Sequence, residues 1–171
     1  MTKTFLLAAV VLAMALQCAL AAVVNVAGVK LDLTPAVVVF AALFASWNRA
    51  LFAAVACGVL LDALSFQALG LSVAPLAVAA AVISHFQRVL YRDNILLQLA
   101  LGGATSLALS VWTWLLLGLG ATPLPFEFGI AAKMALIALL AALGTPPLLW
   151  LFKGAARWTG QWPGAKEVEV F

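Results

Sequence analysis

The sequence predicts an all-α integral membrane protein, a bundle of six transmembrane helices with both chain ends in the cytoplasm. Three observations support this. The 171 residues are 67% hydrophobic and 9% charged, whereas soluble domains are about 25% charged. The apolar residues form long Ala- and Leu-rich runs without the alternation of a membrane β-barrel. Basic residues gather on one side of the predicted spans. A soluble domain is excluded, and so is a nucleic-acid-binding protein, because a net charge of +3 spread this thinly makes no phosphate-binding surface.

The six predicted helices are separated by Gly, Pro, Asn or charged residues. They cover residues 5–24, 35–47, 50–66, 73–86, 95–119 and 128–152, so that residues 1–152 form one transmembrane domain and residues 153–171 a short cytoplasmic tail. The first run also fits a cleavable signal peptide. It is longer than a signal core of about 7–15 residues, which favours a retained helix. Thr34 and Pro35 open the second helix as a hydroxyl cap and a first-turn proline, and Asn94 caps the fifth.

The second and third helices are short for a hydrocarbon core about 30 Å thick. They fit either two tilted crossings or one re-entrant hairpin, and the distribution of charge favours two crossings. With six crossings, one side carries seven basic residues and the other carries only Lys30, an asymmetry typical of cytoplasmic loops. The seven are Lys3, Arg49, Arg88, Arg92, Lys153, Arg157 and Lys166.

Side chains that carry catalysis or bind metals are scarce. His85 has no His or Glu partner at metal-ligand spacing, and Cys18 and Cys57 are predicted to pack inside helices rather than to pair. No Ser-His-Asp set, phosphate-binding loop or nucleotide fingerprint is present. We therefore expect no catalytic residue, no cofactor and no metal, and predict that the protein is not an enzyme.

Two charges remain inside predicted membrane helices, Asp62 and Lys133, each about one turn from the outer edge. An ionised group in hydrocarbon is costly, so each is expected to face the bundle or a wet pocket. Because their depths match, we hypothesise that Lys133 is the polar partner of Asp62. The alternative is that each side chain reaches the outer interface separately.

Small residues recur every fourth position in the third helix, at Ala50, Ala54 and Gly58, and Asp62 continues this face. Such faces let membrane helices approach closely. Packing within the bundle is the default interpretation, and docking of a partner's membrane helix is the alternative.

Residues 58–88 resemble the MreD family of rod-shape-determining membrane proteins. The resemblance rests on Gly58, the Leu60-Leu61-Asp62 step, the Leu69-Gly70-Leu71 element and the apolar helix that ends at Arg88. In order and size of helices it extends over about residues 5–152. It makes Gly58, Leu61, Asp62, Leu69, Gly70 and Leu71 the candidate packing or partner site.

The resemblance implies a non-enzymatic scaffold in the bacterial cytoplasmic membrane, where it takes part in peptidoglycan synthesis and cell shape. Its direct partner would be MreC. RodA, a class B penicillin-binding protein and MreB would form the wider complex. The basic loop around Arg88 and Arg92 would meet anionic membrane lipids or a cytoplasmic partner. The family also resembles, in fold, the substrate-binding S components of energy-coupling-factor vitamin transporters, so a vitamin-binding component is the alternative function.

Overall fold

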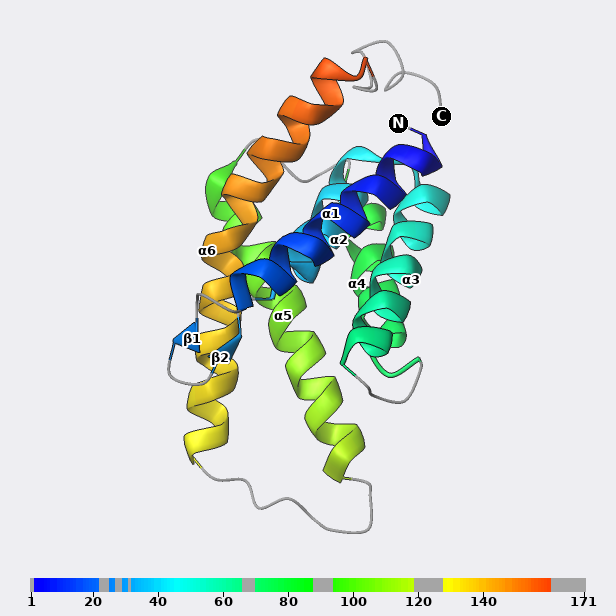
Figure 1. Cartoon of the computed structure of the whole chain (residues 1–171). Helices are drawn as coiled ribbons and strands as arrows, with labels where there is room; N and C mark the ends of the chain where they lie inside the picture. The colour runs from blue at the N-terminus through cyan, green and yellow to red at the C-terminus, as the bar shows by residue number, and fades with distance from the viewer. Residues whose placement is uncertain are drawn as a thin grey trace.

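The computed structural model describes residues 2–21, 25–26, 29–30, 32–65, 70–87, 94–118 and 128–160. Six helices make up almost all of this part of the chain (Figure 1). They are α1 (Lys3–Ala21), α2 (Thr34–Phe44), α3 (Trp47–Leu64), α4 (Val73–Phe86), α5 (Ile95–Gly118) and α6 (Phe128–Trp158). Between α1 and α2, the two-residue strands β1 (Asn25–Val26) and β2 (Val29–Lys30) pair in antiparallel register.

The predicted positions of the six helices are confirmed to within a few residues, and two details differ. The predicted first loop contains the short β1–β2 pair. The predicted cytoplasmic tail begins too early, because α6 continues through Lys153 to Trp158. Residues 153–158 hold no proline and include Ala155, Ala156 and Arg157, which are good helix formers, so the helix does not end at Phe152. The rest of the tail, residues 161–171, lies outside the described residues.

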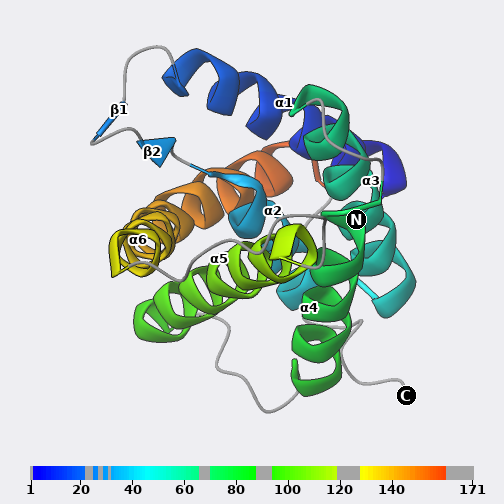
Figure 2. The same cartoon turned by 90° about the horizontal axis from the view of Figure 1, so that it is seen from below.

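α2 lies in the middle of the bundle. All 11 of its residues are buried, and it packs against each of the other five helices (Figure 2). Its sequence is apolar all round, which is typical of a helix with no exposed face. The ring of Phe40 packs against Phe152 of α6 with a centroid distance of 5.3 Å, and against Phe44 one turn further along α2 at 5.4 Å.

The length of the helices modifies the prediction of six crossings. Three described helices are long and apolar enough to cross a membrane, over Trp47–Leu64 of α3, Ile95–Leu116 of α5 and Gly129–Trp158 of α6. The apolar parts of α1, α2 and α4 are shorter. The 11 residues of α2 rise about 17 Å, roughly half of a hydrocarbon core. α2 is therefore a central element enclosed by the others, and its length does not support a full crossing.

The described basic residues of the predicted cytoplasmic side gather at one end of the bundle. Lys3 begins α1, and its ammonium lies 5.8 Å from the ring centre of Phe52 in α3. The ammonium of Lys153 lies 4.9 Å from the ring centre of Phe44. The start of α1, the α2–α3 junction and the end of α6 accordingly meet at the upper end in Figure 1. Lys133, in the second turn of α6, belongs to the opposite end.

Candidate functional site

Asp62 lies in the last turn of α3 and is fully buried. Its carboxylate accepts two backbone N–H groups from the segment that leads into α4. Gly70 N donates to Oδ2 at 2.7 Å, and Ser72 N donates to Oδ1 at 3.1 Å. Ser72 is the residue directly before α4 and is itself buried. The carboxylate therefore ties the end of α3 to the start of α4.

Two glycines complete this connection. Gly70 has φ +101°, a left-handed conformation that a side chain disfavours. Gly58 faces α4 so closely that a Cβ atom there would lie 2.6 Å from Cα of Val73. We call the set Gly58, Asp62, Gly70, Ser72 and Val73 the α3–α4 clamp. It brings together three of the six residues predicted as a packing or partner site.

The other predicted motif residues divide into two groups. Leu61 and Leu71 are half-buried, and Leu61 packs against the hydrophobic core. Leu69 lies outside the described residues, as do Arg88 and Arg92 of the predicted basic loop. The described part of the motif thus coincides with a structural joint between two helices, with Leu61 and Leu71 close to it in sequence.

The structure does not bring Asp62 and Lys133 together. Lys133 is exposed, and no hydrogen bond or ion pair joins the two side chains in the described part of the chain. In Figures 1 and 2, α3 and the first half of α6 lie on opposite sides of α2. A similar depth along the bundle does not make Asp62 and Lys133 neighbours, because α3 and the first half of α6 are separated laterally. Backbone amides solvate Asp62, whereas Lys133 lies at the surface, as the alternative interpretation expects for a side chain that reaches the interface separately.

A polar cluster at the start of α2 was missed in the sequence. Gln17 of α1 accepts the backbone N–H of Leu33 at 3.2 Å with its Oε1 atom, which also accepts the Thr34 hydroxyl at 3.4 Å. Asp32 accepts the N–H of Thr34 at 3.0 Å. Leu33 precedes the helix as its N-cap, and Thr34 does not cap it through its hydroxyl as predicted. The first N–H groups of a helix have no partner within it, and inside a bundle they need one.

Asp32 is partly buried, lies outside the helices and titrates in an unusual environment. Removal from water raises the pKa of its carboxyl above the ordinary value, and hydrogen bonds from Thr34 and Gln17 offset only part of this effect. The available sequence signal was the single Gln in α1 together with an acid two residues before Thr34-Pro35. Asp is one of the residues preferred at helix starts, where its side-chain oxygen accepts a backbone N–H group.

A second close approach, between α5 and α6, was also missed. A Cβ atom at Gly102 would lie 2.8 Å from Cβ of Thr145, which is fully buried. The hydroxyl of Thr145 donates to the carbonyl of Ala141 within its own helix at 2.7 Å. Ala138 and Ala141 are buried along α6 as well. The signal was the Gly102-Gly103 pair within a Leu- and Ala-rich run, which is typical of close contacts between membrane helices.

An apolar groove of about 390 Å³ lies between α4 and α5. Its walls are mainly small and aliphatic side chains, among them Ala74, Val78 and Val82 of α4 and Ala104, Ala108 and Trp112 of α5. The hydroxyl of Thr105, which also lines the groove, donates to the carbonyl of Leu101 at 2.7 Å. The groove therefore suits an apolar surface better than a charged ligand.

The other reactive side chains are scattered. His85 is exposed in the last turn of α4 and its ring meets Phe86 edge-on, with centroids 5.2 Å apart. Cys57 is buried in the core as predicted, whereas Cys18 is exposed on α1. Among the residues that the structure describes, no three His, Cys, Asp or Glu side chains come together in a way that could hold a metal ion.

Comparison with models of protein families, with curated proteins and with solved structures finds no match to this chain.

Proposed function

We propose that this protein is a non-enzymatic, MreD-like scaffold of the bacterial cell-elongation machinery that binds MreC in the cytoplasmic membrane. The α3–α4 clamp is the observation that carries the proposal. Gly58, Asp62 and Gly70 are the residues on which the resemblance rests, and all three serve one joint between two helices. A buried carboxylate whose oxygens accept backbone N–H groups stabilises the arrangement of two helices. A scaffold protein depends on such a stable arrangement to present its binding surfaces.

The proposed topology places the basic end in the cytoplasm. The basic residues at this end are Lys3 at the start of α1, Arg49 at the start of α3, and Lys153 and Arg157 at the end of α6. The positive-inside rule expects such an excess of basic residues on the cytoplasmic side. In this arrangement each of the pairs α1–α2, α3–α4 and α5–α6 enters the membrane and returns. α2 then begins within the bundle, where Gln17 and Asp32 satisfy its first N–H groups.

The groove between α4 and α5 is the described surface that best fits a partner's single membrane helix. Association in lipid depends on close van der Waals packing, because lipid tails are as apolar as the helices. Alanines at 104 and 108 let another helix approach the backbone of α5, and exposed Val78 and Val82 provide apolar contact on α4. We propose that the membrane helix of MreC lies here.

The vitamin-binding alternative has less support. It needs polar side chains that converge on a pocket at the outer side. Both oxygens of Asp62 already accept backbone N–H groups of Gly70 and Ser72, and Lys133 is exposed and makes no hydrogen bond or ion pair with it in the described part of the chain. The groove between α4 and α5 is apolar.

Co-purification tests the proposal. The chain is expressed with an MreC-like protein from the same bacterium, extracted in mild detergent and captured by a tag. We expect the MreC-like protein to be retained. Its absence, together with tight binding of a vitamin, would overturn the scaffold in favour of the S component.

A second pair of variants tests the groove. Ala104→Leu combined with Ala108→Leu fills it, and we expect loss of MreC with an unchanged thermal midpoint. Ala132→Leu and Ala135→Leu make the same change on an exposed part of α6 outside the groove, and should leave capture intact. Undiminished capture by the groove variant would mean that MreC docks elsewhere, while the scaffold function would stand.

A further inference from the structure

Four cations from distant parts of the sequence meet at one end of the bundle. Lys3 begins α1, Arg49 lies in the first turn of α3, and Lys153 and Arg157 lie one turn apart at the end of α6. The two lysine ammonium groups lie over the rings of Phe52 and Phe44, which flank the junction of α2 and α3. These contacts hold positive charge at fixed places around that junction.

Basic residues outnumber acidic ones on the side of the membrane to which this end belongs in the proposed topology. The only acids in the described part of the chain, Asp32 and Asp62, lie before α2 and in the last turn of α3. In the proposed topology the whole cytoplasmic side carries seven basic residues against three acids, Asp93, Glu167 and Glu169. A positive excess therefore remains even if every one of these acids pairs with a base.

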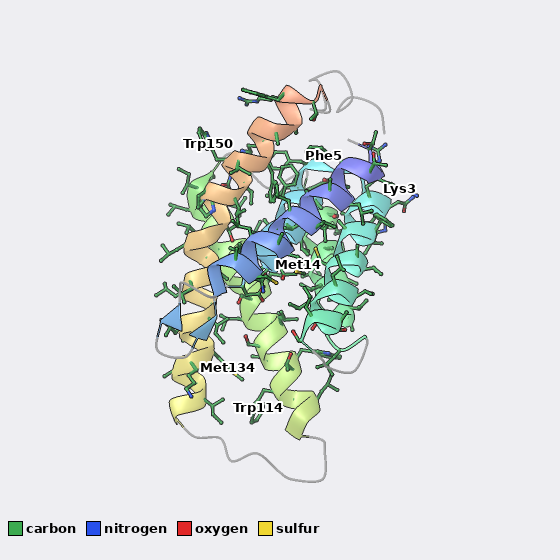
Figure 3. All side chains as sticks on the ribbon, in the orientation of Figure 1. Lys3, Phe5, Met14, Trp114, Met134 and Trp150 are labelled. Carbon is green, nitrogen blue, oxygen red and sulfur yellow. The ribbon has the colours of Figure 1, made fainter. Side chains whose placement is uncertain are left out.

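In the proposed topology, the end of α6 lies at the depth of the lipid headgroups. Lys133 and Lys153 are 20 residues apart, a rise of about 30 Å, which is the thickness of a hydrocarbon core. Trp150 and Trp158, on either side of Lys153, are 79% and 95% exposed. Figure 3 shows Trp150 pointing away from the bundle in the upper part of α6, the same half of the molecule as Lys3. Tryptophan is enriched at this boundary between hydrocarbon and water.

We propose that this basic end, made of Lys3, Arg49, Lys153 and Arg157 with Trp150 and Trp158, is a binding site for the headgroups of anionic phospholipids. The phosphates meet the cations while the indoles lie between headgroups and acyl chains. Lys153 and Arg157 line a hollow of about 800 Å³ whose described wall is the end of α6. Surface basic residues each add on the order of 1 kcal/mol to such binding, about five-fold in affinity. The proposal depends on insertion in a membrane and not on MreC.

Lipid binding by the full-length chain in a neutral detergent tests this site. The probes are phosphatidylglycerol and phosphatidylcholine, and the readouts are lipids retained in native mass spectrometry and the shift in thermal midpoint. We expect retention and stabilisation with phosphatidylglycerol only, weakened by salt. Lys3→Gln with Arg157→Gln removes two exposed charges, and we expect about five-fold weaker binding for each.

Matched variants separate the site from general charge. Lys133→Gln removes one exposed charge from the other end of α6 and should leave lipid binding unchanged, and Arg157→Lys should retain most of it. Equal retention of the two lipids, or an equal loss in Lys133→Gln, would overturn the proposal. So would stabilisation by inorganic phosphate alone, or by an acidic peptide in place of lipid.

Discussion

Gly102 of α5 and Thr145 of α6 are in such close contact that one added methyl group has no room. A Cβ atom at Gly102 would lie 2.8 Å from the Thr145 Cβ and 3.2 Å from its Cγ2. Both residues are buried, and the Thr145 hydroxyl is held by the carbonyl of Ala141. Their contact sets how closely the two longest helices of the bundle approach.

Gly102→Ala should separate α5 from α6. Overpacking in a tight contact costs about 1–3 kcal/mol, so we expect a lower thermal midpoint in detergent. Gly103→Ala is the matched control, because its Cβ would meet Ala142 at 3.4 Å, an ordinary contact. If the two variants had the same thermal midpoint, the contact at Thr145 would not be tight.

Asp62→Ala should weaken the joint between α3 and α4. The N–H groups of Gly70 and Ser72 would lose their acceptor in a buried place, at about 1–3 kcal/mol for each group left unsatisfied. Asp62→Asn keeps one oxygen acceptor and should lose less. Hydrogen exchange at Gly70 and Ser72, followed by mass spectrometry, should rise most in the alanine variant. Unchanged exchange would contradict the assigned role.

Gly70→Ala should be destabilising although nothing lies within 4 Å of the added methyl. The cause is backbone strain at φ +101°, on the order of 1–3 kcal/mol. Gly154→Ala, inside α6 and equally open, should instead raise the thermal midpoint slightly, since alanine favours a helix by about 0.5–1 kcal/mol. Opposite signs for the two variants are the expected result.

Asp32→Asn should make the protein more stable at neutral pH. The folded protein raises the pKa of this carboxyl, so its contribution to stability is complete below about pH 3.9, the unfolded value, and is lost as pH rises through the higher folded value. The amide oxygen of Asn can still accept the N–H of Thr34. Thermal midpoints measured from acidic to neutral pH should fall less in the variant, and parallel curves would contradict a raised pKa.

The helices were predictable because their apolar runs and their breaks are local features. The Asn94 cap, whose Oδ1 accepts the N–H of Leu96 at 3.0 Å, is visible in a few adjacent residues. The enclosure of α2 was not predictable. Its apolar sequence suits lipid and protein interior equally, and only the arrangement of the other five helices distinguishes the two.

The candidate site was predictable in part for the same reason. Gly58 and Asp62 share a helix face, so their common role in the clamp follows from spacing. The pairing of Asp62 with Lys133 relied on depth alone, which carries no information on which helices are neighbours. Gln17 reaches Leu33 across 16 residues of sequence, and no local pattern indicates such a contact.

The enclosure of α2 also constrains the order in which the protein is made. A helix of 11 residues surrounded on all sides has no independent stable place in a bilayer as the chain leaves the ribosome. The residues that cover it, such as Phe152 of α6, are synthesised more than 100 positions later. α2 therefore reaches its final position only after the C-terminal helices have been synthesised. Chains that stop before α6 would leave the centre of the fold uncovered, as substrates for the membrane's quality-control proteases.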